Sequence, residues 1–228
     1  MTTPDTDRHT AERRAEIVHA ALELLDESGF ERLSLRRLAA HLGMHAPGLY
    51  WYIDSKQQLI DLLAKAILDE GMADVATPPP NQDWEEWLVE LACATRRTLL
   101  AHRDGARVVA GAYLLNTNAL SPVIECSLEV LEAAGFERLT ALGATMTLLR
   151  YATGIALDEQ ASPLRDSATA TAAQQLAALS PPPIDAARWP RTADAVQQVF
   201  ARNLRDREQL FRWGAVLIVR GLAGTIRR

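Results

Sequence analysis

The chain has 228 residues, 48% of them hydrophobic, and a formal net charge of −5. This length can bury a substantial core in one or two domains. No apolar run reaches the roughly 20 residues of a membrane-spanning helix, and no signal-peptide pattern opens the chain, so we expect a cytoplasmic protein outside the membrane.

Metal, cofactor and enzyme chemistry find little support in the residues. The two cysteines, Cys93 and Cys126, lack a C-x-x-C spacing, and the five histidines are scattered, so we expect buried thiols, no metal site and no cofactor. A nucleophile elbow, a phosphate-binding loop and a matched carboxylate pair are all missing, which argues against an enzyme.

An amphipathic helix is predicted first, from Thr10 to Ser28, and Gly29 and Phe30 follow it. Its apolar positions recur at the spacing of one helix face. The inward set is Ile17, Val18, Ala21, Leu22 and Leu25.

Two short helices joined by a tight turn are predicted between Ser34 and Tyr52. Ser34 can cap the first helix, and Gly43 can adopt the left-handed conformation that ends it. Pro47 suits the first position of the second helix. The inward residues are Leu35, Leu38, Ala39, Leu42, Leu49 and Ile53. This pattern is typical of a helix-turn-helix DNA reader, and an ordinary helical hairpin is the alternative.

A connector helix is predicted over residues 56–71, opened by a capping box of Ser55 and Gln58. Its apolar set is Leu59, Leu62, Leu63, Ala66 and Ile67. A stiff, helix-free stretch with three prolines follows at residues 77–82.

The rest of the chain predicts a helical domain. Asp83 and Glu86 cap one helix, a second runs from Ser121 to a stop at Gly135, and a long helix covers Arg138 to Gln160. Residues 162–190 are rich in Ala, Ser, Thr and Pro, with a weak helix at 167–179, and are expected to be mobile or to form a lid. A last helix carries two glycines seven residues apart, which line one face.

Taken together, these residues resemble the TetR family of bacterial repressors, specifically its tetracycline-repressor class. The sequence strings most specific to this class are Leu-Tyr-Trp-Tyr at 49–52 and His-Arg-Asp-Gly-Ala at 102–106. Weaker matches are Leu38-Ala39, Leu42-Gly43, Pro47, Lys56, Leu100-Ala101, Gly135-Phe136, Gly154, Leu157-Asp158-Glu159-Gln160, Gly214, Leu217-Ile218 and Gly221-Leu222. The resemblance implies an all-α fold with an N-terminal three-helix helix-turn-helix domain at 1–55. A C-terminal ligand-binding and dimerisation domain at 56–228 follows, with residues 56–71 as the connector helix.

Positive charge gathers around the predicted reader although the whole chain is acidic. Arg32, Arg36, Arg37 and Lys56 oppose Asp54, as phosphate binding requires, and a solvated basic face is the alternative for the arginines. By resemblance, the start of the second helix meets base edges, while the first helix and Lys56 hold phosphates. The DNA-binding candidates are Ser34, Arg36, His45, Ala46, Pro47, Gly48, Tyr50, Trp51, Tyr52 and Lys56.

Base recognition is expected to differ from that of the tetracycline repressors. Those proteins carry Gln and Thr where this chain has Ala46 and Gly48, which implies a different operator. It would be read through thymine methyl contacts, Arg36 and groove shape. Tyr50 either donates its hydroxyl to a phosphate or packs as a half-buried ring.

A two-fold homodimer is expected because one reading helix covers half a palindrome. The predicted dimer-interface residues are Phe211, Gly214, Leu217, Ile218, Gly221 and Leu222. The resemblance implies a four-helix bundle made by the helix around Arg150 and the last helix of each subunit. Packing within one subunit is the alternative explanation of the two glycines.

The resembled class binds its drug through histidine-held magnesium, but the matching positions here hold Val109 and Arg150 beside Asp158. We therefore do not expect this chain to bind tetracycline through magnesium as the resembled class does. The predicted ligand-binding residues are Met72, Trp87, Leu91, Thr95, Val109, Tyr113, Ser127, Leu142, Met146 and Arg150. The apolar members could instead be core, and Arg150 either anchors an acidic or phenolate group or pairs with Asp158, Glu125 or Glu159.

The sequence thus predicts a repressor that binds a palindromic double-stranded DNA operator as a homodimer. A small effector, aromatic or polyketide-like, would release it by moving the connector helix. The alternative is a DNA-binding regulator that is independent of ligand or gated by a protein partner, and a filled C-terminal core would favour it.

Overall fold

The computed structural model describes residues 4–73, 75, 83–161, 183–201 and 206–224, and across these ranges it contains helices and connecting segments but no strand. The predicted all-α fold is confirmed. The elements are α1 (Pro4–Ser28), η1 (Phe30–Arg32), α2 (Leu35–His41), α3 (Ala46–Leu49), α4 (Lys56–Met72), α5 (Trp84–Ala101), α6 (Gly105–Gly111), η2 (Leu114–Asn116), α7 (Ser121–Ala133), α8 (Arg138–Ala161), α10 (Pro190–Ala201) and α11 (Arg207–Ala223).

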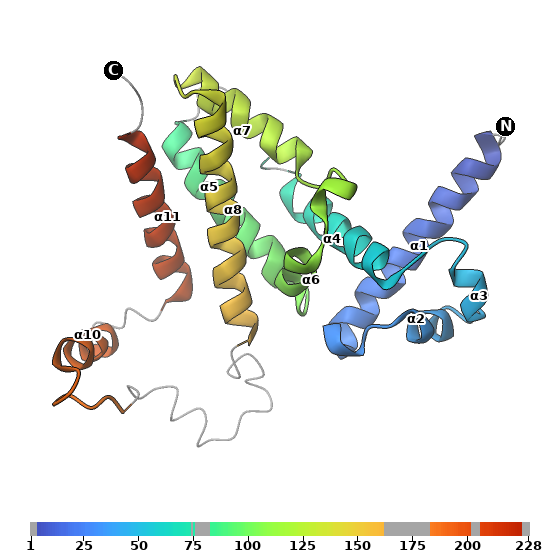
Figure 1. Ribbon diagram of the computed structural model, residues 1–228, viewed down its shortest axis with the longest axis horizontal. Coiled ribbons are helices and arrows are strands. Elements are labelled where there is room, and N and C mark those ends of the chain that lie inside the picture. The colour runs from blue at the N-terminus through green and yellow to red at the C-terminus, as the bar shows by residue number, and fades with distance from the viewer. Residues whose placement is uncertain (1–3, 74, 76–82, 162–182, 202–205, 225–228) are drawn as a thin grey trace.

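Helix α4 connects two groups of helices (Figure 1). On one side it packs against α1, which together with α2 and α3 forms the N-terminal group. On the other side it packs against α5 and α6. Helix α5 lies between α4 and the pair α8 and α11, and α7 packs against α8. A displacement in the C-terminal helices can therefore reach the N-terminal group through α4.

Local capping signals place several helix starts and stops. The Ser34 hydroxyl accepts a hydrogen bond from the Arg37 backbone N–H at 3.3 Å, and Gly43 has a φ of 63°. The Asp83 carboxylate accepts from the backbone N–H groups of Glu85 and Glu86. These predicted caps are confirmed. The sequence predicts them well because each depends on residues within four positions of one another.

Three boundary predictions differ in detail. Helix α1 begins at Pro4, six positions before the predicted start. Pro47 occupies the second position of α3, since α3 begins at Ala46. The Ser55 hydroxyl accepts from the Gln58 backbone N–H at 3.1 Å, as the predicted capping box requires. The Gln58 side chain, however, accepts from the Asp54 backbone N–H, one residue before the Ser55 N–H that a capping box would use.

A single apolar core joins all these helices except α10. Its buried residues include Ile17 and Leu25 of α1, Leu63 of α4, Leu91 of α5 and Phe211 of α11. Among the described residues, no helix is long and apolar enough to cross a membrane. The predicted lid at 162–190, with its weak helix at 167–179, falls largely on residues 162–182, which lie outside the described residues.

Candidate functional site

Helices α2 and α3 form the predicted two-helix reader. Leu38, Ala39 and Leu49 are buried at its centre, and Ile53 is buried just after it. The Met44 backbone N–H donates to the Ala39 carbonyl at 2.8 Å and closes the turn between the helices. Small Ala39 and flexible Gly43 thus allow α3 to cross close to α2 at a fixed angle.

The predicted DNA-binding residues lie in and around this reader, and most are exposed. Trp51 has 84% of its surface exposed and Tyr50 52%. An indole exposed to this degree contributes little to folding, so its surface is free for a partner. The exposed candidates are Arg36, His45, Pro47, Tyr50, Trp51 and Lys56, whereas Ser34, Ala46, Gly48 and Tyr52 are half-buried.

The cations near the reader divide into bound and available groups. The Arg37 guanidinium donates to the Ser28 hydroxyl and to the Arg32 carbonyl, both at 3.2 Å, so it stabilises the link between α1 and α2. Within the described residues, the Arg36 side chain makes no hydrogen bond or ion pair. The Lys56 ammonium lies 5.3 Å from the centre of the Phe30 ring. The exposed Arg32 side chain likewise makes no hydrogen bond or ion pair within the described residues, so Arg32, Arg36 and Lys56 are the cations left available near the reader.

Two sets of contacts that the sequence did not predict orient the reader. The Arg14 guanidinium donates to the Tyr52 carbonyl at 3.1 Å and ties the end of the reader to α1. The second set joins the N-terminal helices to the start of α6. The Asp26 carboxylate accepts from the Arg103 N–H at 2.8 Å, and the Asp104 carboxylate accepts from the Phe30 N–H at 2.8 Å. Only the unusual string at 102–106 signalled this second region.

A cavity of about 830 Å³ opens beside η2, between α7 and α8. It contains three of the predicted ligand residues, Tyr113, Leu142 and Met146. The complete described lining is Ala112, Tyr113, Leu114, Asn116, Asn118, Leu120, Ser121, Ile124, Leu142 and Met146. A cavity of this volume falls in the range of about 300 to 1,000 Å³ typical of small-molecule sites.

The other predicted ligand residues do not line this cavity. Met72, Trp87, Leu91, Thr95, Val109 and Ser127 are buried. The Thr95 hydroxyl lies 3.8 Å from the Met72 sulfur and also donates to the Leu91 carbonyl at 2.8 Å. Met72, Trp87, Leu91 and Val109 belong to the hydrophobic core, as the core alternative describes.

Arg150 is exposed on α8 and does not line the cavity. The alternative pairing of Arg150 with Glu159 is wrong, because Glu159 binds Arg96 instead. The Arg96 guanidinium makes two hydrogen bonds of 2.8 Å to that carboxylate, and this hydrogen bonding raises the pKa of Arg96. The two-pronged pair joins α5 to α8.

A buried carboxylate, Asp61, joins the wall of the cavity to the connector helix α4. Only 5% of Asp61 is exposed. It accepts hydrogen bonds from the Tyr113 backbone N–H at 2.8 Å, from the Gln57 side chain at 2.9 Å and from the Asn116 side chain at 3.4 Å. Gln57 also donates to the Gly111 carbonyl at 2.9 Å. The first turns of α4 are thus bound to the segment that borders the cavity.

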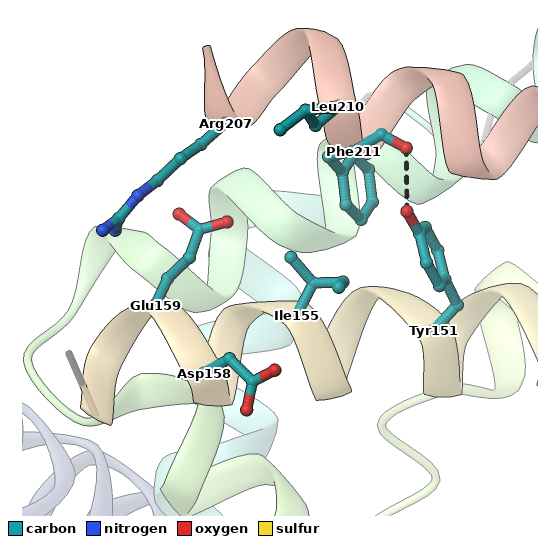
Figure 2. A pocket seen from close by; sticks show the side chains of 7 residues that line it. All are labelled: Tyr151, Ile155, Asp158, Glu159, Arg207, Leu210 and Phe211. Carbon is teal, nitrogen blue, oxygen red and sulfur yellow. Dashed lines mark hydrogen bonds between the residues drawn. The ribbon is translucent and has the colours of Figure 1, made fainter. Parts of the chain in front are cut away.

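Helices α8 and α11 pack through Tyr151 and Phe211, whose rings stack with centres 5.0 Å apart. The Tyr151 hydroxyl donates to the Phe211 carbonyl at 3.0 Å (Figure 2), and burial raises its pKa. A Cβ atom at Gly214 would lie 2.1 Å from that hydroxyl. The close approach that Gly214 permits is therefore to Tyr151 of the same chain.

The outer side of α11 carries a stripe of exposed residues: Leu210, Trp213, Leu217 and Gly221. Their exposed fractions include 64% for Trp213 and 49% for Leu217. Of the predicted dimer residues, Phe211 is buried within the chain, Ile218 and Leu222 are half-buried, and Leu217 and Gly221 face solvent. We call this stripe the α11 face.

Comparisons with known proteins agree with this architecture. A family described as "Tetracyclin repressor-like, C-terminal domain" matches residues 77–226, and one described as "Bacterial regulatory proteins, tetR family" matches residues 17–63. The tetracycline repressor protein class C of Escherichia coli is 40% identical over 153 residues, which cover 66% of this chain and 67% of that relative.

Two solved structures are similar over nearly the whole chain. A possible TetR family transcriptional regulator from Streptomyces coelicolor A3(2) has a TM-score of 0.77 at 34% identity, covering 92% of this chain and 98% of that one. The Streptomyces coelicolor TetR family protein ActR, solved in complex with (S)-DNPA, has a TM-score of 0.73 at 27% identity, covering 94% and 98%.

A helix-turn-helix unit joined by one helix to a helical body defines a DNA-binding transcription regulator. This chain belongs to the TetR family of bacterial regulatory proteins.

Magnesium, which the tetracycline-repressor resemblance implies, does not fit the residues present. Val109 is apolar and 7% exposed, and Arg150 carries a positive charge. Asp158 lies on a separate pocket between α8 and α11 (Figure 2). In the described part of the chain, no group of three or more histidine, cysteine, aspartate or glutamate side chains could hold a metal ion.

Proposed function

We propose that this protein represses transcription in the cytoplasm as a homodimer bound to a palindromic operator. Residues 1–55 would read the DNA, and residues 56–228 would bind the effector and the second subunit. The observation that carries this proposal is the exposed surface of the reader. It carries Arg36, which has no ion-pair partner among the described residues, together with Lys56 and the exposed Trp51.

DNA reading requires two copies of α3. One helix of this size meets half a site, and a dimer places two such helices about 34 to 36 Å apart on one face of the DNA. His45, Ala46, Pro47, Gly48 and Tyr52 would meet base edges. Ser34, Arg36, Tyr50, Trp51 and Lys56 would act around them, chiefly at the phosphates, with Arg36 also reading a base.

The second subunit would pack on the α11 face and the neighbouring exposed side of α8. Apolar residues such as Trp213 and Leu217 are costly to leave in water, and a two-fold contact would cover both copies at once. Among the described residues, and apart from its chain neighbours and its own helix backbone, no atom lies within 4 Å of where a Cβ at Gly221 would be, so another helix can approach there.

An effector in the cavity beside η2 would act through Asp61. A flat aromatic or polyketide-like molecule that displaces Tyr113 or Asn116 would pull on the carboxylate of α4 and turn that helix against α1. The two reading helices would then no longer match successive grooves. A coupling of about 1 to 3 kcal/mol changes DNA affinity several-fold to about a hundredfold.

Regulation by a protein partner alone is the second candidate. A C-terminal core without a cavity would favour this candidate. The cavity of about 830 Å³ favours the small-molecule proposal instead. A catalytic role has no support in a family of regulatory proteins.

The division of roles in the reader can be tested by DNA binding over a range of salt concentrations. Lys56→Ala should lower the salt slope by about one unit, because one phosphate contact is lost. Arg36→Ala should change base preference. Arg138→Ala, an exposed arginine on α8, is the matched control and should behave like the parent protein. Unchanged binding, slope and base preference in both reader variants would contradict the proposal.

A further inference from the structure

The cavity beside η2 has an uncharged lining. Its described residues are apolar side chains together with Tyr113, Asn116, Asn118 and Ser121. The polar members are a phenol, two amides and a hydroxyl, which are neutral donors and acceptors, and none is a carboxylate, an ammonium or a guanidinium. The pocket between α8 and α11 differs, because Asp158, Glu159 and Arg207 all line it (Figure 2).

The carboxylate that is hydrogen-bonded to the cavity wall already has partners. Asp61 lies behind the wall, and three donors occupy its carboxylate. One of them is Asn116, which also lines the cavity. An ionised ligand would therefore compete with these donors for the Asp61 carboxylate.

Neutral hydrogen-bonding groups remain available. In the described part of the chain, no hydrogen bond engages the side chains of Tyr113, Asn118 or Ser121. Each can donate to or accept from a ligand hydroxyl, carbonyl or ether oxygen. A charged ligand would lose part of its hydration against the apolar part of the lining without gaining a counter-charge, and that loss is unfavourable.

We infer that this cavity takes an uncharged, largely apolar small molecule, oriented by neutral hydrogen bonds to Tyr113, Asn118 and Ser121. The inference rests on the proposed function only in treating this cavity as the effector site. It replaces the expectation that Arg150 anchors an acidic group, since Arg150 is exposed and lies outside the lining.

Two fluorescent dyes provide the test. Phenylnaphthylamine and anilinonaphthalene sulfonate share one aromatic frame and differ by a sulfonate group. The parent protein, titrated in high salt to screen its overall charge, should bind the uncharged dye at least about tenfold more tightly. Equal or tighter binding of the sulfonate would overturn the inference.

Lysine substitutions show whether the dyes occupy this cavity. Met146→Lys introduces a cation into the wall, and Ser121→Lys introduces one at an exposed position of the lining, where folding is less at risk. Either variant should shift the preference toward the sulfonate. Leu139→Lys, on α8 but 73% exposed and outside the lining, is the control. Unchanged preferences in both folded wall variants would contradict the assignment of the cavity.

DNA binding by the same preparations separates the two proposals. Preference for the sulfonate with retained operator binding would overturn only the uncharged-ligand inference. Preference for the uncharged dye, lost in the wall variants, supports the inference whether or not the dye releases DNA. If no uncharged ligand that binds in the cavity alters DNA affinity, that result contradicts only the role of the cavity as the effector site.

Discussion

The two cysteines are buried thiols, and burial controls their chemistry. Burial raises the pKa of Cys126 to about 11 and also raises the pKa of Cys93. Both thiols therefore stay protonated at pH 8. Because the thiolate is the reactive form, they should react slowly in the folded protein.

Alkylation by iodoacetamide checks this expectation. At pH 8 the folded protein should label slowly, and labelling of Cys126 should accelerate as the pH approaches 11. In denaturant both thiols should react at the rate of an ordinary cysteine. Rapid labelling of the folded protein at pH 8 would show that these thiols are not protected.

Arg150 illustrates what a sequence reading misses at the level of single residues. Apolar residues surround it in the sequence, so a buried charge that needs a partner was a reasonable expectation. Helix α8 carries apolar residues on several sides, however, and periodicity cannot assign its faces. In the structure Arg150 is exposed, and Glu159 instead pairs with Arg96, which lies 63 positions before Glu159 in the chain.

At the scale of elements, the ties between α4 and the cavity wall should stabilise the fold. Asp61→Ala removes the acceptor for the Tyr113 N–H and for two side chains, which should cost about 1 to 3 kcal/mol. Hydrogen exchange at the Tyr113 amide should accelerate in the same variant. Asp69→Ala, which removes an exposed partner of Lys65 on the same helix, is the control.

Denaturant unfolding and amide hydrogen exchange together test whether Asp61 holds the cavity wall to α4. If Asp61→Ala matches Asp69→Ala in both measurements, the carboxylate does not hold the wall to α4. If the proposed coupling is right, the same variant also responds less to any ligand that occupies the cavity.

Helix boundaries were largely predictable from the sequence because their signals are local. Ser34, Gly43 and Asp83 each act within a few residues of the backbone groups they satisfy. The contacts that connect the helices are not local. Asp61 meets Tyr113 across 52 positions and Asp26 meets Arg103 across 77, and no spacing rule predicts such pairs. For the same reason the cavity contains only three of the ten predicted ligand residues.

At the scale of the whole molecule, the α11 face should join two subunits. Leu217→Glu places a charge where the proposed contact is apolar and should convert a dimer into a monomer with much weaker operator binding. Trp189→Glu changes another exposed apolar residue, 54% exposed, outside this face and is the control.

Analytical ultracentrifugation measures the outcome directly. A parent protein that sediments as a monomer at concentrations where it binds DNA would contradict the dimer proposal. A Leu217→Glu variant that stays dimeric would exclude the α11 face as the contact.

The central claim, that two copies of this reader bind one symmetric DNA site, is tested most directly by selection from a randomised double-stranded DNA library. The proposal predicts enrichment of a palindrome whose half-sites lie one or more helical turns of about 10 base pairs apart, centre to centre. The Lys56→Ala protein should retain less DNA overall. Retained DNA without a palindrome would contradict the claim.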